Sequence, residues 1–323
     1  MTGVGLFSGG LDSILAVKVL QDQGIHIIGV TWVTPFFGAE KAVQVAAGLD
    51  MDHRVVDITL DHLEVVRHPK HGYGRNMNPC IDCHALMFRQ AGRLMEREGA
   101  DFLFSGEVLG ERPMSQNKGS LIRVARESGY EDCILRPLSA KLLPMTRPER
   151  EGKVDRARLL DLSGRGRKRQ MELAEHYGID EYPAPAGGCL LTDPIFSRRL
   201  RDLLKHQEPV SREDLELLKV GRHLRLDPCF KLIVGRDQED NRQIRALWSQ
   251  GNVLLDVREH PSPLGLLSAG APQNLVRLAA SVVLRYSDAP GDQAWTVEIF
   301  DDGHSMDLQA RACPPELTEK LMI

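Results

Sequence analysis

The letters SGGLDS at residues 8–13 stand between a strand-like run and a helical one. Glycines at such a turn let backbone N–H groups approach a ligand closely, and the amino end of the following helix carries partial positive charge. These features together favour binding of phosphate oxygens. The alternative is an ordinary strand-to-helix turn. The chain has no G-x-x-x-x-G-K-[S/T] pattern, so it is not a P-loop kinase or GTPase.

A second candidate for chemistry is the set formed by Cys80, Cys83 and the distant Cys189, which follows two glycines. Three thiolates suit an iron–sulfur cluster better than a structural zinc site, because zinc there takes four protein ligands. The alternatives are a zinc or thioredoxin-like C-x-x-C pair, and an iron-free relay in which one cysteine carries a persulfide and another resolves it. The remaining cysteines are expected to be inert: Cys133, Cys229 and Cys313.

A third candidate is a basic segment. Residues 145–170 hold nine Lys and Arg against four Asp and Glu, whereas residues 286–323 hold two against eight. Guanidinium groups bind phosphate bidentately, so we interpret the densest part of this segment as a site for an RNA backbone. The residues concerned are Arg165, Arg167, Lys168 and Arg169, with Arg198, Arg199 and Arg201 extending the surface. The alternative is a solvated protein face.

The elements that position these residues alternate between apolar runs and helical periodicity, which predicts a doubly wound parallel α/β sheet. The predicted strands are Val4–Phe7, Ile25–Val33, Arg54–Ile58, Asp101–Ser105 and Cys133–Leu138. The predicted helices are Leu11–Gln23, Ala39–Leu49, Leu86–Glu98, Lys168–Tyr177 and Phe196–His206.

A smaller α+β domain is predicted to begin near Ser211, where an S-x-x-D pattern indicates a helix start. Its predicted order is a helix at Ser211–Lys219, then Lys231–Val234 (strand), Gln238–Trp248 (helix), Val253–Val257 and Gly265–Leu267 (strands), Gln273–Arg285 (helix) and Trp295–Phe300 (strand). We therefore divide the chain into an α/β domain (1–150), a basic helical segment with the third cysteine (151–210) and a smaller α+β domain (211–323).

Length and composition agree with this division. A chain of 323 residues with 42% hydrophobic residues forms about two domains, each with its own core. The longest uncharged apolar stretches fall well short of the roughly 20 residues that cross a bilayer. The amino end has no basic region or cleavage site typical of a leader, so a cytoplasmic location without membrane partners is expected.

In its position after the first strand, SGGLDS resembles the pyrophosphate-binding loop of the PP-loop ATP pyrophosphatase superfamily. Members of that superfamily cleave ATP to AMP and pyrophosphate while adenylating a carbonyl oxygen. The resemblance implies that Asp12 helps to hold magnesium and that the other polar and glycine positions of the loop contact pyrophosphate: Ser8, Gly9, Gly10 and Ser13. Ligands lie at the carboxyl ends of strands in such sheets, where we expect Thr31 and Gly106 to join the site.

The cysteine pattern, P-C-x-x-C plus a single cysteine before L-L-T-D, is similar to that of the iron–sulfur-dependent tRNA thiouridine synthetases of this superfamily. The resemblance implies a 4Fe–4S cluster held by Cys80, Cys83 and Cys189, with an open iron for the sulfide that is delivered. It also implies ATP and Mg²⁺ as cofactors and tRNA as the partner. The sulfur donor would be sulfide or a persulfide-carrying protein. Enzymes that make 2-thiouridine and enzymes that make 4-thiouridine both have these sites, so the resemblance covers both products.

The segment after the fourth predicted strand departs from the family. Related synthetases have a histidine where this chain has Glu107, and the aspartate expected a few positions later is absent. We therefore expect Glu107 to be the second metal-binding carboxylate, with a surface glutamate as the alternative.

Residues 232–237 (LIVGRD), with Asn241 and the letters HPS at 260–262, resemble the RNA-binding module of the NFACT family, whose signature is V-G-R-N-x-x-x-N. Asp237 stands where the family has asparagine. The resemblance implies an RNA-binding role for Arg236.

The function predicted from these features is that of an ATP-dependent tRNA sulfurtransferase, which adenylates a uridine carbonyl and replaces its oxygen with sulfur. Asp12 and the three cysteines of the candidate set are the predicted catalytic residues. One alternative is a PP-loop amide-forming ligase that acts on a small molecule. The other is a non-catalytic RNA-binding protein that has kept the fold.

Overall fold

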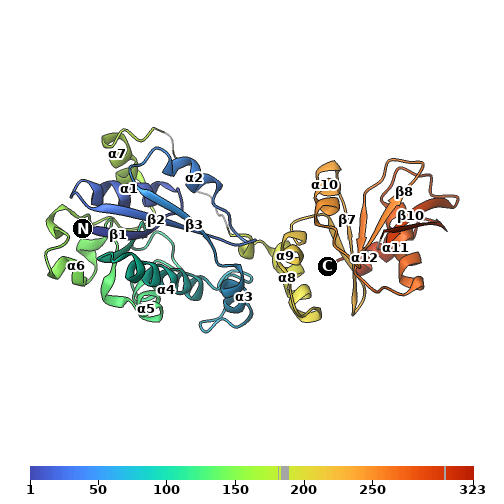
Figure 1. Ribbon diagram of the computed structural model, residues 1–323, viewed down its shortest axis with the longest axis horizontal. Helices are drawn as coiled ribbons and strands as arrows, with labels where there is room; N and C mark the ends of the chain where they lie inside the picture. Colours follow the sequence, from blue (N-terminus) through green and yellow to red (C-terminus); the bar gives the residue numbers. More distant parts are fainter. Residues whose placement is uncertain (181, 183–188, 302) are drawn as a thin grey trace. The chain divides into compact units, whose positions relative to one another are not determined.

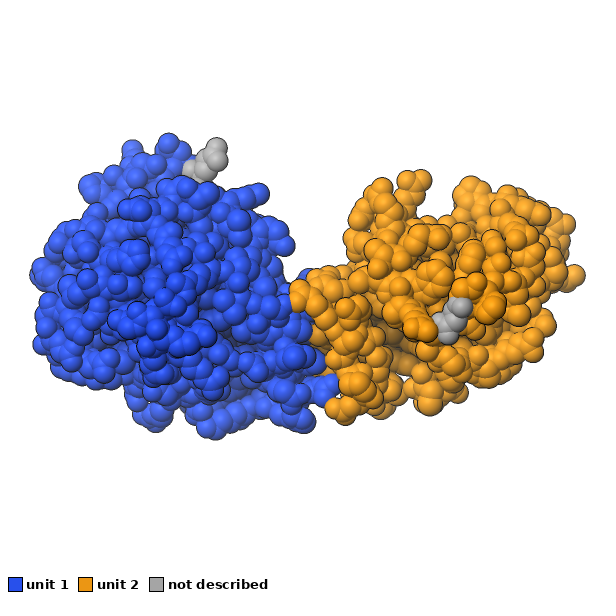
Figure 2. Space-filling view, in the orientation of Figure 1, with its two compact units in different colours: residues 1–193 blue, residues 194–323 orange. Residues whose placement is uncertain are grey.

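The computed structural model describes residues 1–180, 182, 189–301 and 303–323. The chain forms two compact units, Met1–Asp193 and Pro194–Ile323 (Figure 2). The predicted middle segment is therefore divided, because residues 151–193 pack in the first unit and 194–210 in the second. The predicted glycine-rich approach to Cys189, at 183–188, lies outside the described residues.

The first unit is built on a five-stranded parallel sheet in the order β3-β2-β1-β4-β5 (Figure 1). Its strands are β1 (Thr2–Leu6), β2 (His26–Val33), β3 (Asp52–Asp57), β4 (Phe102–Ser105) and β5 (Ile134–Leu135). All five lie where the sequence predicts strands, but β5 is only two residues long. The predicted doubly wound α/β class is confirmed.

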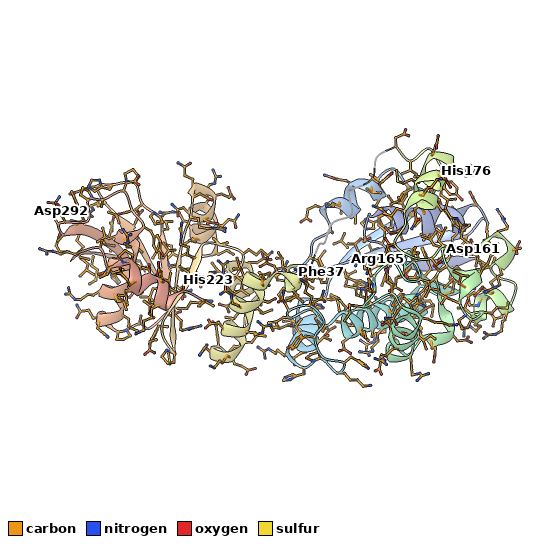
Figure 3. All side chains as sticks on the ribbon, turned by 180° about the vertical axis from the view of Figure 1, so that it is seen from behind. Phe37, Asp161, Arg165, His176, His223 and Asp292 are labelled. Carbon is orange, nitrogen blue, oxygen red and sulfur yellow. The ribbon has the colours of Figure 1, made fainter. Side chains whose placement is uncertain are left out.

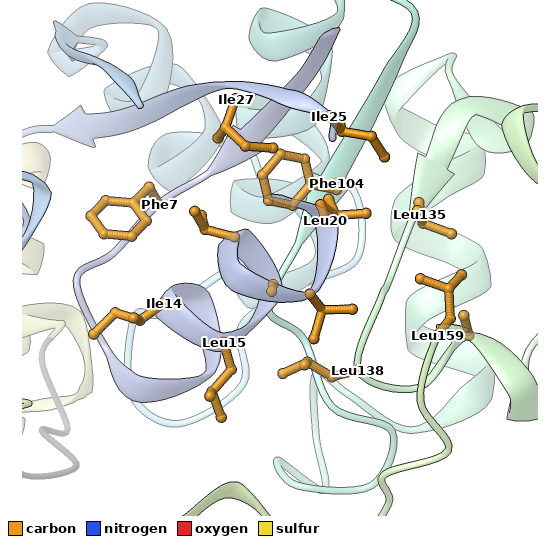
Figure 4. Close-up of a cluster of buried hydrophobic side chains, with 14 of the residues drawn as sticks. Phe7, Ile14, Leu15, Leu20, Ile25, Ile27, Phe104, Leu135, Leu138 and Leu159 are labelled. Atoms are coloured by element: carbon orange, nitrogen blue, oxygen red, sulfur yellow. The ribbon is translucent and has the colours of Figure 1, made fainter. Parts of the chain in front are cut away.

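Helices cover both faces of this sheet (Figure 1). They are α1 (Leu11–Gln21), α2 (Glu40–Ala46), α3 (Thr59–Arg67), α4 (Cys80–Glu98), α5 (Lys118–Ser128), α6 (Arg147–Arg150) and α7 (Lys168–His176). On one face α1, α2 and α7 pack in a core that includes Ile14, Leu20 and Phe104 (Figure 4). On the other face α4 and α5 pack in a core around Val30, Phe88 and Leu103. The sheet is thus buried on both sides, as parallel sheets are.

The strand registers bring the predicted site segments to one edge. Leu6, the last residue of β1, pairs with Val30 in β2 and with Ser105 in β4. Parallel strands all point the same way, so Ser8, Thr31 and Gly106 lie at the same carboxyl edge of the sheet. This is the convergence that the sequence predicts.

The helices of the first unit differ from the predicted set in two ways. Helices α3, α5 and α6 are additional. The predicted helix at Leu86 begins six residues earlier, at Cys80, directly after Pro79. The C-x-x-C pair therefore belongs to the first turn of α4 and not to a loop before it, because a proline at the helix start costs no intrahelical hydrogen bond.

The second unit contains an antiparallel six-stranded sheet in the order β11-β10-β8-β9-β7-β6. The strands are β6 (Arg222–Asp227), β7 (Phe230–Val234), β8 (Val253–Val257), β9 (Gly265–Leu267), β10 (Trp295–Asp301) and β11 (His304–Ala310). The helices are α8 (Pro194–His206), α9 (Arg212–Leu217), α10 (Gln238–Leu247), α11 (Gln273–Arg285) and α12 (Pro315–Leu321). The predicted order is present, and β6, β11 and α12 are additional.

Two cores hold this second unit together. Helix α11 packs on one face of the sheet around Leu232, Leu255 and Val283. Helices α9 and α10 cover the other face around Ile233, Ile244 and Leu254 among others. The predicted second α+β domain is confirmed. No helix in the described part of the chain is long and apolar enough to cross a membrane.

Candidate active site

The SGGLDS segment forms a tight turn between β1 and α1. Gly9 has a φ of +71°, and a Cβ there would lie 2.7 Å from the Cα of Ala42 at the start of α2. Ser13 donates a 2.7 Å hydrogen bond to the Gly10 carbonyl, and its hydroxyl lies 3.4 Å from that of Ser8. No side chain caps the amino end of α1. Its first N–H groups are therefore available to an anion, as the sequence predicts for a phosphate site.

Gly106 joins the same site from β4. A Cβ at this position would lie 2.5 Å from the backbone carbonyl carbon and oxygen of Asp12 and 2.6 Å from the nitrogen of Ser13. The backbone after β4 therefore passes directly against the first turn of α1, and only glycine permits this approach.

We expect Gly106→Ala to displace the start of α1 or the loop after β4. Because the added methyl group meets backbone atoms, the free energy of unfolding should fall by about 3 kcal/mol, at the upper end of typical overpacking costs. Thermal unfolding and ATP binding would measure the effect. The matched control is Gly166→Ala, whose Cβ would meet no atom within 4 Å. Equal stability of the two variants would contradict this account of the glycine.

Two carboxylates lie together beside the turn. The side chains of Asp12 and Glu111 share a hydrogen bond, and Asp12 Oδ1 is buried with no hydrogen-bond partner among the described residues. Burial raises the pKa of Asp12, and burial together with the Asp12 charge raises the pKa of Glu111. Mg²⁺ prefers one or two carboxylates plus substrate phosphates. The pair fits a magnesium ion that accompanies a nucleotide.

The carboxylate beside Asp12 is thus Glu111, which sequence reasoning did not single out. Glu107 is instead buried against Arg136 and His84: its carboxylate accepts hydrogen bonds from Arg136 Nε at 2.9 Å, His84 Nδ1 at 3.0 Å and the Ser105 hydroxyl at 3.0 Å. Burial alone would raise the pKa of Glu107, but the Arg136 charge and the His84 hydrogen bond outweigh it and lower the pKa to about 2. With its oxygens engaged, Glu107 is not the predicted metal ligand.

Two arginines supply positive charge to this pair. The charges of Arg167 and Arg112 both act on Asp12 and on Glu111, and the Gln170 amide hydrogen-bonds to Asp12. Arg167 precedes α7, which packs against α1 in the same core. It therefore points toward the phosphate-binding turn, although the sequence groups it with the RNA-binding cations. Two guanidinium groups here would balance the negative charge of a triphosphate.

Thr31, predicted to line the nucleotide site, is buried at the end of β2. Its hydroxyl donates a 2.6 Å hydrogen bond to the Phe7 carbonyl, and its Oγ1 lies 2.8 Å from His53 Nε2. The hydroxyl is thus engaged with protein groups, and contact of Thr31 with a nucleotide stays a prediction.

The three candidate cysteines come together from separate parts of the first unit. Cys80 and Cys83 lie one turn apart on α4, and Cys189 precedes a short 3₁₀ turn at Leu190–Thr192. That turn is tied to the rest of the unit by hydrogen bonds from Leu190 N to the Phe36 carbonyl (3.2 Å), from Met77 N to the Leu191 carbonyl (3.1 Å) and from Asn76 Nδ2 to the Thr192 carbonyl (2.6 Å). Residues 76 and 77 directly precede the C-x-x-C pair, so these bonds draw Cys189 toward it.

Burial dominates the acidity of these thiols. It raises the pKa of all three, to about 11 for Cys189, and the charges of Cys80 and Cys189 add to the effect on Cys83. The charge of Cys80 also raises the pKa of Cys189, so Cys83 and Cys189 each lie within range of another thiol of the set. The charge of Arg112 lowers the pKa of Cys80 and also acts on Asp12. The cysteine set and the phosphate-binding turn thus both lie within range of the Arg112 charge.

The described side chains include no group of three or more His, Cys, Asp or Glu placed to hold a metal ion. Cys83 has a different partner, because its Sγ lies 3.2 Å from Nε2 of the buried His62. An iron–sulfur cluster on these three thiols stays a prediction.

In iron-free protein we expect Cys189 to react slowly with iodoacetamide. A pKa of about 11, against 9.0 for an ordinary thiol, makes the reactive thiolate about 100-fold rarer at neutral pH. Because the pKa is raised, the alkylation rate should climb about tenfold per pH unit until pH approaches 11. Peptide mass spectrometry would follow the rate, with the urea-unfolded chain as control. A plateau already at pH 8.5 would contradict the prediction.

The predicted basic surface is only partly free. Arg169 pairs with Asp161 at 2.7 Å and Lys168 approaches Glu172 at 4.0 Å, while Arg165 is exposed (Figure 3). RNA binding by these residues stays a prediction.

The VGRD signature of the second unit chiefly shapes its own turn. Asn241 accepts a hydrogen bond from Leu264 N and donates one to the Ser262 carbonyl, which fixes the start of β9. A Cβ on Gly235 would lie 2.2 Å from Asn241 Oδ1. The guanidinium of Arg236 is held by Asp240, and half of its side chain remains exposed. An RNA contact by Arg236 would compete with this ion pair.

Comparisons with known proteins agree with the resemblances noted for each of the two units. Residues 221–322 match the family described as NFACT protein RNA binding domain. Over 129 residues the chain is 28% identical to the tRNA-specific 2-thiouridylase MnmA 3 of Bacteroides fragilis. The aligned region makes up 39% of this chain and 35% of the relative. It is 32% identical over 114 residues to the tRNA-specific 2-thiouridylase MnmA of Pelobacter propionicus, covering 31% of each. The predicted resemblances to PP-loop tRNA thiouridine synthetases and to the NFACT module are confirmed.

The chain spans about a third of the length of these curated relatives. Among solved structures, a 4-thiouridine synthetase–RNA complex with bound ATP is similar over 60% of this chain and 45% of its own, at 20% identity and a TM-score of 0.39.

Proposed function

We propose that this protein is an ATP-dependent tRNA sulfurtransferase that makes 2-thiouridine or 4-thiouridine. The observation that carries the proposal is the position of Arg112, whose charge acts on Asp12 at the phosphate-binding turn and on Cys80 in the cysteine set. An enzyme that activates a base with ATP and then replaces its oxygen with sulfur needs these two sites side by side. The tRNA-thiolating relatives and the NFACT-type match support tRNA as the substrate.

In the first step the uridine carbonyl oxygen attacks the α-phosphorus of ATP, an O–P bond forms, and the bond to the β-phosphate oxygen breaks. The amino end of α1 and the turn at residues 8–10 would bind the pyrophosphate that leaves. Asp12 and Glu111 would hold Mg²⁺, which supplies positive charge to the phosphates, and Arg167 would neutralise further charge.

In the second step sulfur bonds to the base carbon and the carbon–oxygen bond to AMP breaks. We propose that Cys80, Cys83 and Cys189 hold this sulfur, in one of two forms. A 4Fe–4S cluster would supply an open iron for sulfide. In the iron-free form one cysteine would accept the outer sulfur from the persulfide of a donor protein, whose thiol is the leaving group. A second cysteine would then attack the inner sulfur, which releases the outer sulfur to the base and leaves a disulfide that an external dithiol reduces. The sulfur donor and a cytoplasmic location stay predictions.

The test uses purified protein with ATP, Mg²⁺, sulfide and tRNA, followed by mass spectrometry of the digested nucleosides. We expect one thiolated uridine per AMP and pyrophosphate released, and loss of that nucleoside in a strain lacking the protein. Pyrophosphate release that needs an amine and no tRNA would favour the amide-forming ligase. The non-catalytic alternative predicts tRNA binding without ATP turnover.

A further inference from the structure

Helix α8 has two opposite faces. Its buried side chains are Phe196, Ser197, Leu200 and Leu203. Its exposed cations stand at i, i+3 and i+7 on the other side: Arg198, Arg201 and Lys205. On a helix with 3.6 residues per turn, these three positions fall on one stripe about 10 Å long. We call these three residues the α8 stripe.

The stripe has no acidic partner among the described residues, unlike three arginines elsewhere in the second unit. None of its three side chains forms an ion pair or hydrogen bond with any other residue in the described ranges. By contrast, Arg242 pairs with Glu239, Arg245 lies 3.7 Å from Asp256, and Arg258 donates to Asp307 at 2.7 Å.

Arg199, between the stripe residues in sequence, points the other way. Its guanidinium donates to the Leu218 and Gly221 carbonyls, both at 2.8 Å, which anchors α8 to the turn after α9. Its role is structural, although the sequence groups it with Arg198 and Arg201. The basic surface of α8 therefore includes Lys205. It does not include Arg199, which the sequence predicts to be part of it.

Like charges three and four residues apart on a helix repel each other, so the stripe is destabilising when nothing covers it. Asp202, on the same helix, pairs with Arg225 and with none of the three stripe residues. The stripe thus lacks an ion pair among the described residues, which fits a polyanionic partner that supplies the counter-charge. The stripe offers guanidinium and ammonium groups alone, which suit phosphate oxygens and do not read base edges.

We propose that the α8 stripe binds the sugar–phosphate backbone of the tRNA. This inference rests on the proposed function, which makes tRNA the substrate. The contact is independent of base sequence, and each phosphate neutralised steepens the dependence of log affinity on log salt by about 0.7 to 0.9.

The test compares two triple variants of the full chain. Arg198→Gln/Arg201→Gln/Lys205→Gln removes the stripe, and Arg242→Gln/Arg245→Gln/Arg258→Gln removes three acid-paired arginines of the same unit. Both lower the net charge by three, so a difference between them reports position and not total charge. Fluorescence anisotropy with labelled tRNA, without ATP, is measured from 50 to 300 mM KCl.

For the stripe variant we expect the slope of log affinity against log salt to fall by about 2 and the affinity at 0.1 M KCl to fall tenfold or more. The control variant should stay within about twofold of wild type, and at saturating tRNA the stripe variant should keep the wild-type kcat for thiolation. A stripe variant that matches the control in affinity and slope overturns the proposal and leaves the proposed function standing. Wild-type protein that binds no tRNA overturns both.

Discussion

Asp12→Ala should abolish pyrophosphate release from ATP in the presence of tRNA and leave a folded protein that is as stable as wild type or more stable. The carboxylate is largely buried, and one of its oxygens has no partner among the described residues, so the folded chain gains little from keeping it. The proposed role of the Asp12 carboxylate is to hold Mg²⁺ beside the phosphates. We expect the rate to fall at least about 100-fold, the scale reported for loss of a charge-stabilising group.

Thermal unfolding and pyrophosphate release measured on the same preparation separate the two effects. The control is Asp50→Ala, which removes an exposed carboxylate of the same unit and should change neither quantity. Glu111→Gln should raise the Mg²⁺ concentration needed for half-maximal rate, whereas a Glu107 variant should lose stability. If Asp12→Ala turns over ATP at near the wild-type rate, the assignment of the phosphate site is wrong.

The second large effect concerns sulfur transfer. If Cys80, Cys83 and Cys189 hold a cluster, changing any one of them to Ser should reduce thiolation to background, a fall of at least about 100-fold; if they form a relay, two of the three variants should show this fall. A hydroxyl neither carries a persulfide nor ligates iron as a thiolate does. Adenylation precedes sulfur transfer, so pyrophosphate release with tRNA should persist in these variants. Cys229→Ser, at an exposed thiol, should leave both activities unchanged and serves as the control.

Iron content distinguishes the two forms of the sulfur site. With a 4Fe–4S cluster, protein purified without oxygen should be brown with about four irons per chain, and each serine variant should lose them. With a persulfide relay, the protein should be colourless, and mass spectrometry of the cysteine peptides should show an added sulfur. If all three serine variants still thiolate tRNA at the wild-type rate, both forms are refuted.

Much of the fold was predictable because it depends on short-range patterns. The five parallel strands of the first unit follow from apolar runs, and the phosphate-binding turn follows from two glycines between a strand and a helix. Strands such as β11 were not predictable in this way. Four of its seven residues are exposed in succession, so its sequence lacks the alternation that marks a half-buried strand.

Residue types and their spacing are enough to indicate the kinds of chemistry: a phosphate-binding turn with Asp12, a set of three cysteines and an excess of cations. Which side chains take part depends on how the chain packs. Glu107 is neutralised because β5 and α4 bring Arg136 and His84 to it, so Glu111 becomes the partner of Asp12. The packing of α7 on α1 turns Arg167 inward in the same way. Such choices depend on charges far apart in the chain, which a local pattern of residues does not encode.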